Sequence, residues 1–225
     1  MIVVVGLPAY TDAPDGEKCA GGLAVDIAAA AVARGATVEL VGKVGEDGAG
    51  DAVVVALGRM GVGHAALLRD PAHSTPVLTV AAPAVPAASD VDGPEIEADA
   101  APTRRILPED PADRPGLDAA DVELGLRYLP QAGVIVVADP LPEAATATVV
   151  DGAAFGSARL VLLVPEGAVV PSVPAGATVL GAPADDDGSF GWLVGAFAAA
   201  LDSGSEPATA FDEAVRSAGW EPAEG

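Results

Sequence analysis

The residues that decide the fold read GGLAVDIAAAAVARGATVELVGKVGEDGAGD and occupy positions 21–51. Two glycines open an alanine-rich segment that predicts a helix over residues 23–34, and Gly35 ends it. Residues 37–41 (TVELV) are typical of a short buried strand, and a turn rich in glycine and acid leads to a second helix over residues 49–60. The stretch predicts a helix–strand–helix unit whose functional surface lies at its glycine turns.

The same alternation of strands and helices continues along the rest of the chain. It begins with residues 1–5 (MIVVV), a run expected of a strand buried on both faces of a parallel sheet. Further strands are expected at residues 76–81, 134–138, 159–164 and 178–180, and further helices at residues 121–129, 142–155, 189–201 and 207–218. This order predicts an α/β three-layer domain with a central, mostly parallel sheet, and such sheets bind ligands at the carboxyl ends of their strands.

The length of 225 residues predicts one domain over residues 1–225, which is long enough to bury a core. Aromatic residues are only 4% of the sequence, so the core must consist of alanine, valine and leucine. Residues 7–20 read as a polar loop. Residues 82–115 are rich in proline and predict an irregular connection, for which a β-hairpin arm around residues 103–107 is one form.

The net charge and the cysteine content indicate which classes of partner are excluded and which cellular compartment to expect. The formal net charge of −22 argues against nucleic acid and anionic membranes as partners, because their phosphates would be repelled. The single cysteine, Cys19, excludes an intramolecular disulfide. No basic leader precedes residues 1–5, and the longest apolar stretch is too short to cross a bilayer, so we expect a cytoplasmic protein.

The stretch at residues 21–51 resembles the first signature of the ribokinase-like (PfkB) carbohydrate kinases. The matching positions are Gly21, Gly22, Asp26, Gly35, Gly42, Val44, Gly45, Asp47 and Gly50. The resemblance implies a ribokinase-like fold, ATP and Mg²⁺ as cofactors, and a sugar or nucleoside as the small-molecule partner. It also implies substrate binding by Gly21, Gly22, Asp12 and by Asp26, which stands where the family has asparagine.

A second signature of the family, Asp-Thr-x-Gly-Ala-Gly-Asp before an apolar helix, aligns with residues 185–191 (DDDGSFG). The alignment implies an anion and nucleotide loop formed by Asp185, Gly188 and Ser189. The aspartate that accepts the proton of the sugar hydroxyl in the family falls on Gly191, which cannot accept a proton. The second glycine of the anion loop falls on Phe190, whose side chain we expect to crowd the backbone amides there.

Several acidic residues have two interpretations. Asp187 is the nearest candidate for a displaced catalytic base, but carboxylates before a helix more often cap it than hold a metal. Asp12 can bind a sugar or lie free in a loop, and Asp26 can bind substrate or favour the helix dipole. Asp47 is expected to have a structural role in the turn that contains it. Arg104 can meet a phosphate or form a local ion pair.

The family's β-strand lid lies between the first strand and the two glycines, where this chain has only residues 7–20. We therefore expect a lid that is reduced or absent, and a homodimer, if one forms, through another surface. Three hypotheses follow. The first is a catalytically impaired homologue (a pseudokinase) that binds a sugar- or nucleoside-like ligand. The second is an active ATP-dependent sugar kinase with Asp187 as base, and the third is a non-catalytic structural or assembly protein.

Overall fold

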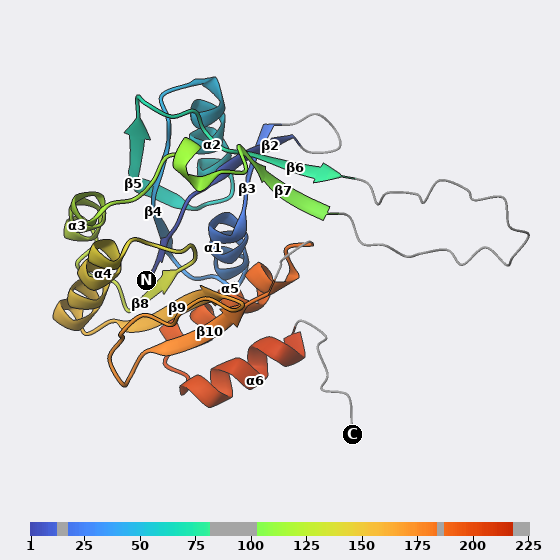
Figure 1. Cartoon of the computed structure of the whole chain (residues 1–225). Coiled ribbons are helices and arrows are strands. Elements are labelled where there is room, and N and C mark those ends of the chain that lie inside the picture. Colours follow the sequence, from blue (N-terminus) through green and yellow to red (C-terminus); the bar gives the residue numbers. More distant parts are fainter. Residues whose placement is uncertain (13–17, 82–102, 184–186, 218–225) are drawn as a thin grey trace, which may run out of the picture.

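The computed structural model describes residues 1–12, 18–81, 103–183 and 187–217. Its centre is a six-stranded, fully parallel sheet with the strand order β10-β9-β8-β1-β4-β5 (Figure 1). The strands are β1 (Ile2–Val5), β4 (Val38–Gly45), β5 (Gly63–Asp70), β8 (Val134–Val137), β9 (Arg159–Pro165) and β10 (Thr178–Ala182). The predicted α/β class with a parallel central sheet is confirmed.

The middle strands of the sheet are covered on both faces. β1 (IVVV) and β8 (VIVV) are buried along their whole length, which is why they consist only of β-branched residues. The chain runs from β1 outward to β4 and β5, and then returns to place β8, β9 and β10 on the other side of β1. The order of the strands therefore reverses next to β1, and ligands of open parallel sheets bind at the carboxyl ends of the strands at such a point.

Helices cover both faces of the sheet (Figure 1). One face packs against α1 (Leu23–Ala33), α2 (Gly48–Arg59), α5 (Ser189–Asp202) and α6 (Pro207–Ser217), and the other against α3 (Ala119–Arg127) and α4 (Glu143–Gly156). Both cores are built mainly from alanine, valine and leucine, as the composition predicts. A rare aromatic contact joins α5 to α6, where the rings of Phe197 and Phe211 meet edge to face at 6.0 Å.

A second, smaller sheet corrects the expectation for residues 7–20. It has the order β3-β2-β6-β7, with β2 (Ala9–Asp12), β3 (Lys18–Gly21), β6 (Val77–Ala81) and β7 (Thr103–Leu107). The prediction of a polar loop too short for lid strands was wrong, because β2 and β3 pair antiparallel within that segment. An antiparallel sheet with one face in water accommodates polar residues, so the polar composition of residues 7–20 did not exclude strands there.

Two further segments complete the comparison with the expected elements. β5 was not predicted, because it is an edge strand whose residues alternate irregularly between buried and partly exposed. β7 pairs antiparallel with β6, so the described part of the proline-rich connection begins with a regular strand, and residues 82–102 lie outside the described residues. Within the part of the chain that the structure describes, no helix is long and apolar enough to span a membrane.

Candidate functional site

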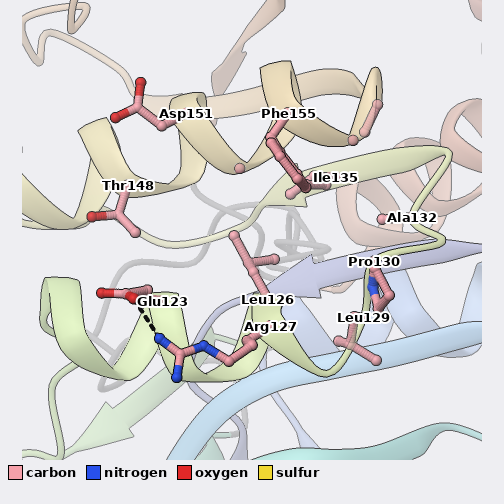
Figure 2. Close-up of a pocket in the computed structure, with 13 residues that line it drawn as sticks. Glu123, Leu126, Arg127, Leu129, Pro130, Ala132, Ile135, Thr148, Asp151 and Phe155 are labelled. Atoms are coloured by element: carbon pink, nitrogen blue, oxygen red, sulfur yellow. Dashed lines mark hydrogen bonds and ion pairs between the residues drawn. The ribbon is translucent and has the colours of Figure 1, made fainter.

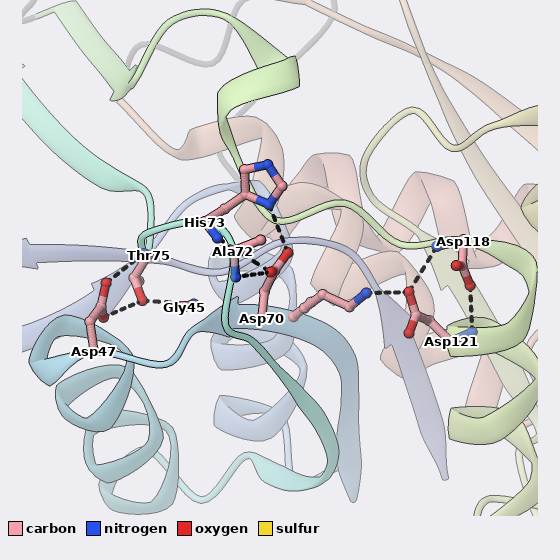
Figure 3. Close-up of polar contacts among 9 residues, drawn as sticks. Gly45, Asp47, Asp70, Ala72, His73, Thr75, Asp118 and Asp121 are labelled. Carbon is pink, nitrogen blue, oxygen red and sulfur yellow. Dashed lines mark hydrogen bonds and ion pairs between the residues drawn. The ribbon is translucent and has the colours of Figure 1, made fainter.

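The second half of the glycine signature contains a polar clamp around Asp47 (Figure 3). One carboxylate oxygen of Asp47 accepts hydrogen bonds from the Gly50 amide at 2.8 Å and the Thr75 hydroxyl at 2.7 Å, and the other accepts from the Thr75 amide at 2.9 Å. Burial acts to raise the pKa of Asp47, but these hydrogen bonds outweigh it and hold the pKa below its usual value. Asp47 thus caps α2 and ties the turn before it to Thr75, in agreement with the structural interpretation of this residue.

The glycines around the clamp are required by close backbone contacts. A Cβ atom at Gly45 would lie 2.5 Å from the Thr75 nitrogen, and one at Gly50 would lie 2.4 Å from the Gly45 oxygen. At Gly42 a Cβ atom would lie 2.6 Å from the Gly6 oxygen, where β4 passes the end of β1. This half of the signature therefore encodes packing of the turn rather than contact with a ligand.

The polar groups beside the clamp also have structural partners (Figure 3). Lys43 on β4 forms an ion pair with Asp121, which belongs to the capping box of α3 together with Asp118. His73 contacts Asp70 through its Nδ1 atom at 3.0 Å. The first contact joins β4 to α3, and the second lies at the start of the connection from β5 to β6. Both contacts are structural, so the candidate site is sought at the other half of the signature.

That other half is the pair Gly21 and Gly22 before α1. Gly22 adopts φ 97°, a left-handed conformation that favours glycine, and its carbonyl oxygen accepts the first hydrogen bonds of α1, from Val25 and Asp26. A Cβ atom at Gly21 would lie 2.8 Å from the Leu78 side chain of the small sheet. The two glycines therefore let the small sheet turn sharply into α1 and bring the first turn of α1, including Asp26, beside that sheet.

Asp26 lies where α1, the small sheet and the start of α5 come together. Nη2 of Arg104, on β7, lies 2.7 Å from Oδ2 of Asp26, and the two side chains are only 14% and 19% exposed. Gly188, the residue before α5, has φ 82°, and a Cβ atom there would lie 2.6 Å from Nη1 of Arg104. The structure thus brings together the predicted residues Asp26 and Gly188, with Arg104 between them. Sequence reasoning expected an ion pair for Arg104 but not this partner, 78 positions away.

Sequence reasoning missed a further acid, Asp139, which lies two residues after the end of β8. Its Oδ2 atom accepts a hydrogen bond from the Leu7 amide at 2.7 Å. A Cβ atom at Gly6 would lie 2.6 Å from that oxygen and 2.8 Å from Cβ of Ala24 on α1. Asp139 therefore lies where the ends of β1 and β8 meet the start of α1, next to the reversal in strand order. An acid immediately after a fully apolar strand is the signal that could have found it.

Asp139 lies in a largely desolvated environment beside a cavity. Desolvation raises its pKa, against the Leu7 hydrogen bond and the charge of Arg114, which lower it. Asp139 lines a cavity of about 330 Å³ beyond the ends of β8 and β9. The lining includes Glu143, Thr146 and Ser172 as further polar residues and Leu141 and Val169 as apolar ones. Among the described residues, no lysine or arginine lines the cavity, and the polar groups that do are carboxylates and hydroxyls.

Comparisons with known proteins were then decisive for the fold. No protein-family model and no curated protein matches the sequence. Solved structures match over almost the whole chain: Arabidopsis thaliana ribokinase complexed with ribose and ATP has a TM-score of 0.63 at 15% identity and covers 96% of this chain and 90% of its own. A PfkB protein from Polaromonas has a TM-score of 0.64 at 12% identity, with coverages of 96% and 94%. The chain has the ribokinase-like fold.

A third structure agrees with this assignment. A putative phosphofructokinase from Staphylococcus aureus has a TM-score of 0.61 at 14% identity and covers 98% of this chain and 92% of its own. At these identities the likeness establishes the ribokinase-like fold and not an activity. The match supports the resemblance that the glycine signature indicates.

The described residues that align with the family's second signature lie at the start of α5. Gly191 is buried in the first turn of the helix. The Phe190 side chain is 6% exposed and belongs to the core, so the expectation that it crowds the anion loop is corrected. Asp187 is exposed, and its Oδ1 atom accepts a hydrogen bond from the Ser189 amide at 2.8 Å, which lowers its pKa. Asp187 therefore caps α5.

The remaining predicted residues lie at the margin of the site or outside the described part. Asp12 is exposed at the end of β2 and accepts a hydrogen bond from the Tyr10 hydroxyl. Asp185 lies outside the described residues. Among the residues that the structure describes, no three histidine, cysteine or acidic side chains come together as ligands for a metal ion.

Proposed function

We propose that this protein binds a sugar- or nucleoside-like small molecule at the carboxyl edge of its central sheet and does not transfer phosphate. The observation that carries the proposal is the start of α5, where Gly191 takes the place of the base and the neighbouring carboxylate of Asp187 is bonded to the Ser189 amide. Phosphoryl transfer to a sugar needs a group that accepts the hydroxyl proton. Glycine has none, and a carboxylate with a lowered pKa is a weak base.

The anion loop supports the same conclusion. The amides at a helix N-terminus bind phosphate when they are free and the local charge is positive. Here the Ser189 amide already donates to Asp187, whose negative charge would repel a nucleotide phosphate. The nearby cation, Arg104, is paired with Asp26. A nucleotide would have to displace both contacts, so we expect ATP to bind weakly or not at all.

The cavity beside Asp139 suits a polyhydroxyl ligand better than the start of α5 suits a nucleotide phosphate. The cavity beside Asp139 has a volume of about 330 Å³, at the lower end of the range for small-molecule sites, roughly 300–1,000 Å³. Its carboxylates and hydroxyls accept hydrogen bonds from a polyhydroxyl ligand, and its apolar walls suit the carbon face of a sugar ring. Ribose in the Arabidopsis ribokinase structure is a ligand of this class. We assign Asp139 as the main acceptor, with Gly21, Gly22 and Asp26 on the adjoining side and Asp12 at the margin.

The test is binding by calorimetry and thermal shift, with ribose, fructose, adenosine and Mg–ATP in parallel. A ligand at a hundred times its dissociation constant stabilises the fold by about 2.7 kcal/mol. We expect a sugar or adenosine to stabilise the protein and Mg–ATP not to. Asp139→Asn should remove the sugar effect, whereas the matched variant Asp212→Asn, on the exposed side of α6, should keep it. Stabilisation by no ligand would favour the structural or assembly role.

The alternative of an active kinase has one observation in its favour. Asp187 is exposed at the N-terminus of α5, close enough to Arg104 for that charge to lower its pKa. Incubation with labelled Mg–ATP and each sugar would detect transfer directly. Transfer that disappears in Asp187→Asn would overturn the pseudokinase proposal and identify Asp187 as the base.

A further inference from the structure

An apolar groove of about 600 Å³ lies between α3 and α4, away from the site described above (Figure 2). Its floor is formed by Leu129 and Ile135, and Leu126 of α3 and Phe155 of α4 stand at its sides. The charged residues Glu123, Arg127 and Asp151 lie on its rim. The groove is thus an apolar hollow with both signs of charge around it.

Glycine residues of α4 explain why the hollow exists. At Gly152 a Cβ atom would lie 2.7 Å from Cδ1 of Leu126, so this glycine allows α3 and α4 to touch at one point. At Gly156 a Cβ atom would meet nothing within 4 Å, so the space beside the end of α4 is open. In the described part of the chain, α3 and α4 are the helices that cover this face of the sheet, whereas four helices pack against the other. The hollow is therefore left unfilled by the chain's own side chains.

Phe155 is 93% exposed, although it stands at the edge of this hollow. The ring extends the apolar surface of the groove, and contiguous apolar surfaces of this kind are sites of protein contact. The aromatic ring and the hollow lie on the same face of the molecule. A surface that carries both a protruding ring and a matching hollow is complementary to a copy of itself, as a twofold interface requires.

The rim of the groove is less acidic than the chain as a whole. The chain has a net charge of −22, so most of its surface repels a second copy. At the groove, Arg127 balances Glu123 at 2.6 Å, and Asp151 is the remaining charge on the rim. We propose that the protein forms a twofold homodimer through α3 and α4, in which Phe155 of each copy enters the groove of the other. This arrangement leaves the small sheet free.

Sedimentation velocity with light scattering tests the proposal on the full chain. We expect a concentration-dependent dimer that strengthens with added salt, because salt screens the repulsion between two strongly acidic molecules. Phe155→Glu should yield a monomer, since it places a charge in the apolar contact. Val55→Glu makes the same change at an exposed position of α2 and should leave the dimer intact.

A second variant fills the hollow from within. Gly156→Leu meets no neighbour at its Cβ atom, so it should fold and still weaken the dimer at least tenfold by occupying the place of the partner's ring. A wild-type chain that stays monomeric at all concentrations and salt levels overturns the proposal. If that monomer bound the apolar dye anilinonaphthalene sulfonate and Gly156→Leu abolished the binding, the groove would belong to a small molecule instead. A dimer that persists in Phe155→Glu would also overturn the proposed interface.

Discussion

At the residue scale, the acidic side chains differ in what their oxygens accept. Asp47 receives three hydrogen bonds from the turn around it, Asp26 receives a guanidinium, and Asp139 receives one amide while lining a cavity. The first is a structural clamp, the second joins the small sheet to α1, and the third is the residue that we propose as a ligand acceptor. Because the chain has 33 acidic residues, composition alone does not separate these roles.

Replacement of Asp47 should destabilise the protein. Asp47→Ala removes the cap of α2 and leaves the Thr75 amide without its acceptor, so we expect a loss of about 2 kcal/mol in the free energy of unfolding. The neighbouring variant Glu46→Ala, at an exposed position, should change stability by less than about 0.5 kcal/mol. Urea unfolding measures both.

The effect of Asp47 should also depend on pH. Its pKa is lowered in the folded state, so its contribution is complete above the unfolded value of about 3.9 and is lost as the pH falls through the folded value. The difference between wild type and Asp47→Ala should therefore shrink in acid. A difference that stays constant down to the acid transition would contradict the clamp.

The ionised carboxylate of Asp139 should lower the stability of the protein, whereas that of Asp47 raises it. Desolvation raises its pKa in the folded state, so its ionised form costs stability once the pH exceeds the folded value. Asp139→Asn should be more stable than wild type at neutral pH, and the gain should vanish below about pH 3.9, where the carboxyl is protonated in both states. Urea unfolding across this pH range checks it. An equal or lower stability of the variant at neutral pH would show that the Leu7 hydrogen bond outweighs desolvation.

At the scale of the elements, the crossing of α1 and α5 decides where the candidate site forms. The two helices pack so closely that a Cβ atom at Gly195 would lie 2.4 Å from the Ile27 oxygen and 2.6 Å from Cβ of Ala30. Both helices begin at the site, one after Gly22 and the other after Gly188. Close packing along their length therefore places their N-termini side by side.

Gly195→Ala should lower stability by about 1–3 kcal/mol, because the added methyl group overlaps the backbone of α1. This loss opposes the gain in helix propensity, about 1 kcal/mol, that the same substitution brings at an open position. The matched variant Gly58→Ala, exposed on α2 with its nearest neighbour at 3.6 Å, should show that gain. Thermal and urea unfolding compare the two, and a stabilising Gly195→Ala would contradict the close crossing.

At the scale of the whole molecule, the net charge of −22 causes repulsion among side chains in both the folded and the unfolded chain. Like charges are closer together in the compact fold than in the unfolded chain, so their repulsion disfavours folding. The few cations described in the structure are engaged in local contacts, as Lys43 is with Asp121 and Arg104 with Asp26. The overall repulsion therefore remains largely uncompensated.

The melting temperature should rise as sodium chloride is added. The Debye length falls from about 30 Å at 0.01 M salt to about 8 Å at 0.15 M, so most of the gain should come in that range. The same titration near the isoelectric point is the control, because there the net repulsion is absent and the curve should be flat. A melting temperature that does not depend on salt at neutral pH would contradict the argument.

The sequence by itself determined the layered α/β architecture and most of its elements. The buried strands β1 and β8 and the helices α1 and α5 lie within a residue or two of their expected ranges, because hydrophobic periodicity and bounding glycines are local signals. The glycine signature also located the start of α1 and the turn of Asp47. Local patterns did not predict β2, β3 and β5, whose stability comes from pairing with other strands and not from their own composition.

The arrangement of the candidate site was decided only by the tertiary structure. Asp26 and Arg104 are 78 residues apart, and the Leu7 amide and Asp139 are 132 residues apart, so no local pattern joins them. The core position of Phe190 likewise depends on how α5 packs against the sheet. Sequence patterns report the preferences of neighbouring residues, whereas a site at a sheet edge forms where distant strand ends and helix starts meet.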